Sequence, residues 1–322
     1  MSNWGMQANR FGGTSKAWAR SHHRIRRLIG HFIVLVTRGR PLESFETAKQ
    51  LVRCVADAME AYQKAYELAG ILHRDISVGN IMMTLNREYR RGLFIDWDHC
   101  VLVDRVCGSS RISRTGTWPF VSAYLLENPD VEHTFVDDRE SALYVLVWVA
   151  LRHLPHALFA GSLKATLEIF DACVVESGQR DVGGGAKQSA LIADTFSSGI
   201  GLKVSGLEIC LATLCEIFAA RYKTVTNHRF KSAAQIAAEL AWQKEALALL
   251  EKPSWFYDTL RTFSEEIAEP PKEGTDWCDN MKLVQDEAER RAGRQKRDLM
   301  DKQESHSKHY RGYDGLATPP KI

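Results

Sequence analysis

The chain has no apolar stretch long enough to cross a membrane. Its longest apolar run, Ala142 to Leu151, covers about half of the ~20 residues that a spanning helix needs. Residues 1–27 are polar and rich in glycine, serine and basic side chains, so they cannot be a signal peptide with an apolar core. We therefore expect no membrane partner.

The cysteines have no organised spacing. They are odd in number, and no two of them form a short paired motif, which argues against both a disulfide framework and a zinc site. Reduced thiols in the cytoplasm or nucleus are the simplest interpretation. The cysteines are Cys54, Cys100, Cys107, Cys173, Cys210, Cys215 and Cys278.

A strong charge imbalance is also missing. The formal net charge of the 322 residues is +2, which argues against nucleic acid as a partner. A content of 45% hydrophobic and 25% charged residues is typical of a soluble globular protein. Composition thus predicts a folded protein and leaves its chemistry to local motifs.

One polar motif lies between apolar segments and carries chemistry. His73-Arg74-Asp75 is followed by Asn80, and the tripeptide Ile95-Asp96-Trp97 comes after a segment that can form a short hairpin. Phosphoryl transfer to a hydroxyl needs an acid to accept the proton, and an amide oxygen with a second carboxylate to hold magnesium. An isolated Asp75 would more simply be a turn or a helix cap, but the joint pattern favours a kinase catalytic loop.

Two short strands would bring these residues together. Ile81–Met83 and Gly92–Ile95 are apolar, and the residues between them form a polar turn, Asn86 to Arg91. Paired as a hairpin, the strands would carry Asn80 and Asp96 to the same edge.

The rest of the chain is predicted to be mainly helical. A helical stripe runs from Ser44 to Leu68 and ends at Gly70, and Asp138 to His153 is apolar on nearly every face, as expected of a central buried helix. Further helices are expected at roughly 163–177, 187–196, 205–221 and 232–250, and the pattern weakens beyond Pro253. Gly183 to Lys187 lacks the outer glycine of a phosphate-binding loop and is expected to be a flexible loop.

With these motifs in hand, the chain resembles the fungal-type protein kinase family from about His31 to Leu250. The resemblance implies a mainly α, protein-kinase-like large helical lobe with a short catalytic β-hairpin. It rests on marks that occur in order: His73 to Ser77 with Gly79-Asn80, Ile95 to Asp98, Arg114 to Phe120, and His133 with Asp137 to Ser141.

The resemblance implies a role for each site residue. Asp75 would orient and deprotonate a Ser or Thr hydroxyl of a protein substrate, while Asn80 and Asp96 would hold magnesium and ATP. Thr117 would bond to Asp75, and Ser77 stands where Ser/Thr kinases usually carry a lysine. Asp138 would accept hydrogen bonds from backbone amides of the catalytic turn.

The chain also departs from the pattern of ordinary protein kinases. Asp98 replaces the glycine of Asp-Phe-Gly, and Ser122-Ala123-Tyr124 replaces Ala-Pro-Glu, so we expect the usual ion pair that anchors the activation segment to be missing. The residues before His31 are too few for the strands, glycine-rich loop and lysine of a small lobe. We therefore expect the small lobe to be largely absent and the chain to be a truncated form with little activity alone.

These expectations divide the chain into four parts. They are a loose leader at 1–28, a remnant of the small lobe and hinge at 29–43, the large lobe at 44–252, and a charged, partly disordered extension at 253–322. Two other functions stay open: a non-catalytic binding or scaffolding module, and a small-molecule phosphotransferase, which often carries an Asp-Trp-acid similar to residues 96–98. His73-Arg74 and Gly116-Thr117 favour a protein substrate.

Overall fold

The computed structural model describes residues 38–85, 91–103, 116–176, 180–225, 231–268, and 279–292 apart from 283 and 291. Several predicted features lie outside these residues. They are the leader 1–28, residues 29–37 of the small-lobe remnant, most of the turn at 86–91, Arg114 and Thr115 of the family motif, and the part of the charged extension after 292.

The described part of the chain is mainly α, which confirms the predicted fold class. The long helices are α1 (Ala48–Ala69), α3 (Phe135–His153) and α7 (Ala233–Glu251). The shorter ones are α2 (Ala123–Glu127), α4 (Ala160–Asp171), α5 (Gly185–Ile192), α6 (Leu207–Ala219) and α8 (Trp255–Glu266). None of the described helices is long and apolar enough to cross a membrane.

Helix α1 leads the chain into the segment predicted to be the catalytic loop. It begins after Thr47, whose side chain accepts a hydrogen bond from the Gln50 amide. It ends at Gly70, which adopts a left-handed conformation with φ of 60°. The stop expected at this glycine is confirmed.

The predicted hairpin is confirmed as well. Strand β3 (Ile81–Thr84) pairs antiparallel with β4 (Gly92–Phe94), with Ile81 opposite Phe94. Strand β1 (Gly39–Pro41) adds to the free edge of β3, while β2 (Ile71–Leu72) pairs separately with β5 (Val101–Leu102). The hairpin packs directly on α1, since a Cβ at Gly92 would lie 1.7 Å from the Cys54 carbonyl oxygen.

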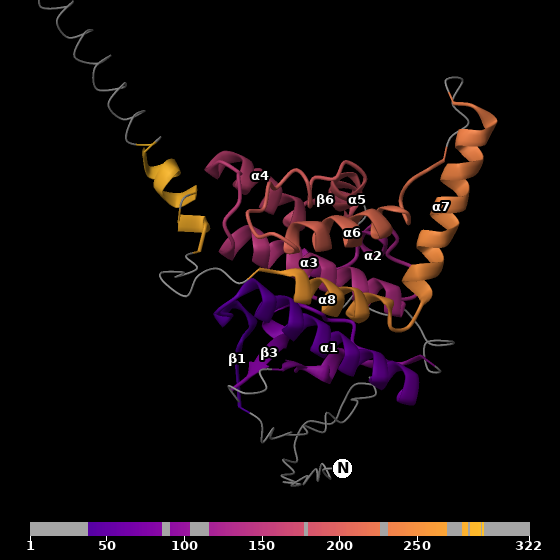
Figure 1. Ribbon diagram of the computed structural model, residues 1–322, viewed down its shortest axis with the longest axis horizontal. Coiled ribbons are helices and arrows are strands. Elements are labelled where there is room, and N and C mark those ends of the chain that lie inside the picture. The colour runs from indigo at the N-terminus through magenta and orange to yellow at the C-terminus, as the bar shows by residue number, and fades with distance from the viewer. Residues whose placement is uncertain are drawn as a thin grey trace, which may run out of the picture.

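Helix α3 is the central helix, as its apolar sequence predicts. Figure 1 shows it among α1, α6 and α8, and its apolar side chains from Ala142 to Leu151 are buried except at Trp148. Its buried Arg139 joins distant parts of the fold. The Arg139 guanidinium donates to the Gln63 side chain on α1 and to the Leu250 and Pro253 carbonyls at the junction of α7 and α8.

Helix α8 lies within residues 253–322, the part of the chain expected to be a charged, partly disordered extension. Its apolar face buries Trp255, Phe256 and Leu260, and it packs along α1 (Figure 1). The compact body therefore continues past residue 252. Farther along, the Asn280 side chain caps the end of α3 by donating to the Leu151 and Leu154 carbonyls at 2.9 and 3.0 Å.

The region between α4 and α5 differs from the expectation. Helix α4 stops at Asp171, and the chain forms a hairpin of β6 (Cys173–Glu176) and β7 (Arg180–Gly183). Gly183 to Lys187, expected to be a flexible loop, instead holds the last residue of β7 and the first turn of α5, with Gly184 alone between them. The flexible-loop expectation is wrong because this glycine turn is packed against another segment of the chain, Trp118 to Ala123.

Candidate active site

The loop between β2 and β3 holds Asp75 and Asn80 in direct contact. The Asn80 amide nitrogen donates to the Asp75 carbonyl oxygen at 2.8 Å and to Asp75 Oδ2 at 3.2 Å. The loop is short and turns through Val78–Asn80, a single 3-10 turn. The side-chain amide of Asn80 thus fixes the orientation of the Asp75 carboxylate.

Thr117 contacts the other oxygen of the same carboxylate. Both its backbone N–H and its hydroxyl donate to Asp75 Oδ1, each at 2.8 Å. The preceding Gly116 has φ of 119°, and a Cβ there would lie 3.0 Å from the Arg74 carbonyl oxygen. A glycine is therefore needed for the Thr117 segment to lie this close to the catalytic loop.

Asp96 follows the second strand of the hairpin. The Ile95 amide donates to the Asn80 carbonyl at 3.0 Å, so the two strands stay paired up to the residue before Asp96. Asp96 then adopts a left-handed conformation with φ of 59° and is exposed. Such a conformation is unusual for a residue other than glycine and often marks a functional position.

Ser77 lies inside the loop and is buried. Its carbonyl accepts the Asn80 amide at 3.1 Å, which closes the 3-10 turn. A serine there supplies no cation, so we expect charge stabilisation at this position to be weaker than with a lysine or to come from another residue. The roles assigned to Asp75, Asn80, Asp96 and Thr117 likewise stay predictions, although the structure brings these residues to one edge.

Asp138 binds the backbone of the loop at His73 and Arg74, as the resemblance implies. Its carboxylate accepts the His73 amide at 3.0 Å and the Arg74 amide at 3.1 Å. A third donor is the His133 ring, with Nε2 at 2.8 Å from Oδ1. Burial acts to raise the pKa of Asp138, but His133, Tyr62 and His73 all act to lower it, and the net result is a pKa below the usual value.

The His73 ring is a structural part of the site. It is fully buried, packs against Phe94 and Trp97 with ring centroids 4.9 and 4.6 Å away, and bonds to the Ile95 carbonyl at 3.2 Å. Burial lowers the pKa of His73. The neutral ring thus links the catalytic loop to the hairpin strand that ends at Asp96.

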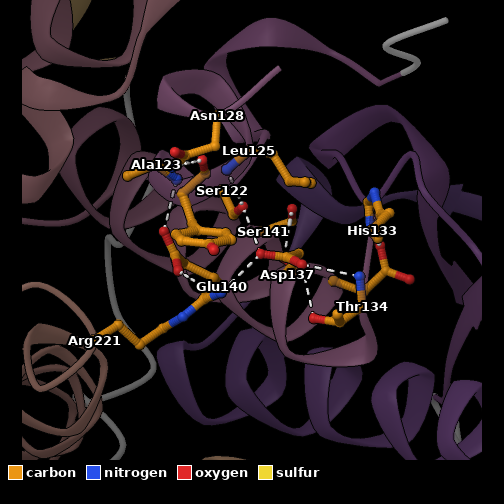
Figure 2. A network of polar contacts seen from close by, with 12 residues as sticks. Ser122, Ala123, Leu125, Asn128, His133, Thr134, Asp137, Glu140, Ser141 and Arg221 are labelled. Atoms are coloured by element: carbon orange, nitrogen blue, oxygen red, sulfur yellow. Dashed lines mark hydrogen bonds and ion pairs between the residues drawn. The ribbon is translucent and has the colours of Figure 1, made fainter. Parts of the chain in front are cut away.

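An ion-pair network anchors the segment after Thr117. Glu140 on α3 accepts the Ala123 amide at 2.7 Å and pairs with Arg221, while the Ser122 hydroxyl donates to Asp137 at 2.8 Å (Figure 2). Arg221 also bonds to Asp137 at 2.9 Å. In place of the usual ion pair to an acid of this segment, Glu140 on α3 pairs with Arg221 and also holds the segment through the Ala123 amide.

Tyrosines complete this network. The Tyr222 hydroxyl lies 2.6 and 2.7 Å from the two Glu140 oxygens and accepts the Tyr124 amide at 3.1 Å. Burial acts to lower the pKa of Arg221, but Glu140, Tyr222 and Asp137 act to raise it, and the net shift is upward. The guanidinium thus stays charged at any physiological pH.

Sequence reasoning missed Glu140, Arg221 and Tyr222 as anchors of the site. One signal was present, since Asp137 to Glu140 places four consecutive charged residues at the start of a helix that is otherwise buried. Buried charges need partners, but the sequence does not say which distant residues supply them.

Comparison with known families supports the motif analysis. Residues 5–150 match the family model described as fungal protein kinase. The match spans the catalytic loop, the hairpin, the Thr117 segment and most of α3, and confirms the resemblance. A comparison with curated proteins finds no match.

Proposed function

We propose that this chain, which is similar to the fungal protein kinase family over residues 5–150, transfers the γ-phosphoryl group of ATP to Ser or Thr hydroxyls of a protein. The observation that carries the proposal is the carboxylate of Asp75, which Thr117 and Asn80 hold from both sides. A fixed carboxylate at this place in the motif is suited to receive a proton from an acceptor hydroxyl.

Asp75 would act as the catalytic base. The substrate hydroxyl oxygen forms a bond to the γ-phosphorus, the bond from that phosphorus to the ADP oxygen breaks, and the hydroxyl proton passes to Asp75. Thr117 and Asn80 keep the carboxylate in one orientation during this step. Positioning of this kind supplies much of the rate in phosphoryl transfer.

The donor set fits magnesium bound together with a nucleotide. Because the Asn80 amide nitrogen donates to Asp75, its oxygen is free of that contact and can serve as a ligand with the Asp96 carboxylate. Among the described residues, no cluster of three or more His, Cys, Asp or Glu side chains could hold a metal by itself. Magnesium suits such a site because it usually takes one or two protein carboxylates plus substrate phosphates. When bound, it would neutralise phosphate charge.

The nucleotide would also need a cover over its phosphates. Kinases use a glycine-rich loop and a strand lysine for this purpose. Within the described part of the chain, the strand before α1 is the three-residue β1, which cannot supply both. We propose that the described lobe alone binds ATP weakly and transfers phosphate slowly.

The first test is binding of ATP with and without magnesium, measured by calorimetry. We expect magnesium to increase the affinity for ATP. In Asp96→Asn this increase should be smaller by at least about tenfold, because losing even an outer-shell partner of a metal site commonly lowers affinity by this factor. Asp258→Asn on α8 is the control and should bind as the wild type does. If ATP fails to bind under either condition, the chain is better explained as a scaffolding module.

The second test is transfer of labelled phosphate from ATP to a library of Ser/Thr peptides. Asp75→Ala should lower the rate by about 100-fold or more, the loss expected when a general base is removed, while ATP binding is retained. Transfer to choline or aminoglycosides but not to peptides would contradict a protein substrate. A rate unaffected by Asp75→Ala would contradict the assigned base.

A further inference from the structure

The glycine turn between β7 and α5 lies directly against the segment that follows Thr117. A Cβ at Gly184 would lie 2.3 Å from the Ala123 carbonyl oxygen, and one at Gly183 would lie 2.7 Å from the Trp118 ring. Gly184 also has φ of 98°, which disfavours other residues. Because these two glycines have no side chains, the backbone of the turn can lie directly against residues 118–123.

Lys187 reaches into the same segment from the first turn of α5. Its side chain is 1% exposed, and Nζ donates to the Trp118 carbonyl at 3.1 Å and to the Val121 carbonyl at 2.9 Å. These carbonyls flank the 3-10 turn Trp118–Phe120, which starts immediately after Thr117. The amine thus fixes both ends of the turn that presents Thr117 to Asp75.

The choice of a lysine at this place is costly for the fold. Burial lowers the pKa of Lys187 to about 7, even though Glu140 and Asp171 act to raise it. The Nζ also lies over the Tyr144 ring, 4.8 Å from its centroid. An apolar side chain of similar length could fill the space without burying an amine, so stability alone does not explain the lysine.

We propose that Lys187, together with the Gly183–Gly185 turn, is a positioning element that holds residues 117–121 in the conformation that docks the protein substrate beside Asp75. The proposal rests on the proposed kinase function for its consequence in catalysis. The clamp itself is a statement about local structure and can be tested without any activity.

The experiment is hydrogen exchange of the intact chain, followed in peptides that cover residues 116–126. Lys187→Met keeps the length of the side chain and loses both hydrogen bonds of the amine. We expect the exchange rate of residues 116–126 to rise by about tenfold in this variant, the equivalent of one to two ordinary hydrogen bonds. Exchange in α1 and α3 should be unchanged. Lys164→Met is the matched control, because Lys164 is an exposed lysine on α4 whose partner is Glu168. It should leave all peptides unaffected.

Two further variants keep the proposal falsifiable. Lys187→Gln has a shorter side chain that still carries an N–H donor, so its exchange rate at residues 116–126 should lie between those of the wild type and Lys187→Met. It replaces Lys187→Met if that variant does not fold. Gly184→Ala, whose new Cβ would press on Ala123, should also loosen residues 116–126. Unchanged exchange there in folded Lys187→Met or Lys187→Gln would overturn the clamp.

Kinetics would separate the clamp from the proposed function. If the wild type phosphorylates peptides, Lys187→Met should raise the KM for peptide severalfold and leave ATP affinity unchanged. An equal effect on peptide and ATP would overturn the positioning role. If the wild type shows no transfer, the kinase proposal fails, and the exchange data still decide whether Lys187 holds the segment.

Discussion

Replacing Asp138 with alanine is expected to lower the free energy of unfolding by about 3–5 kcal/mol, the usual cost of removing one partner from a buried charged cluster. The variant would leave the His73 and Arg74 amides and the His133 ring without the buried carboxylate that accepts their hydrogen bonds. Urea unfolding followed by circular dichroism measures the change. Such a loss is a large fraction of the roughly 5–15 kcal/mol that typically stabilises a domain.

The control for this variant is Asp258→Ala, since Asp258 is an exposed aspartate on α8. It should change stability by no more than about 0.5 kcal/mol. A loss below about 1 kcal/mol in Asp138→Ala would mean that the three donors find other acceptors and that Asp138 does not fix the loop.

The contribution of Asp138 to stability should also depend on pH in the acid range. The pKa of Asp138 in the folded protein lies below its ordinary value of 3.8. Its stabilising contribution is therefore complete above the unfolded pKa and is lost as the pH falls through the folded one. The wild type should lose more stability on acidification than Asp138→Asn does, since the amide cannot titrate.

The catalytic loop and hairpin could be predicted because their signals are local. His73, Asp75 and Asn80 lie within one short stretch, and the two apolar strands that follow are joined by a brief polar turn, which favours their pairing as a hairpin. The contact of Thr117 with Asp75 came from the family resemblance, because spacing alone does not bring together residues so far apart.

Long-range partners explain most of what the sequence did not predict. Glu140 and Arg221 are 81 positions apart, and Lys187 and Val121 are 66 apart. The apolar sequence of α3 shows that this helix is buried, but not which distant side chain meets each of its charges. Helix α8 was overlooked for a related reason, because its short apolar stripe is interrupted by charged residues and gains its stability from packing on α1.

Replacing Glu140 with alanine is the second large effect that we expect. Arg221, the Ala123 amide and the hydroxyls of Tyr144 and Tyr222 would all lose a buried acceptor. We expect a loss of about 3–5 kcal/mol in urea unfolding, and a similar loss for Arg221→Ala, which leaves the acid unpaired instead. Glu168→Ala, which breaks an exposed pair with Lys164, should cost less than about 1 kcal/mol.

A double-mutant cycle decides whether Glu140 and Arg221 act as one anchor. Each single variant leaves the other charge buried without its partner, and removing that second charge as well ends this penalty. The double alanine variant should therefore lose clearly less unfolding free energy than the two single losses added together. Additive losses would show that the two residues stabilise the fold independently. In the non-additive case, the Ala123 amide still lacks its acceptor in the double variant. Hydrogen exchange of residues 116–126 should then stay fast even where overall stability partly recovers, which would show that the ion pair holds this segment and does not stabilise the core alone.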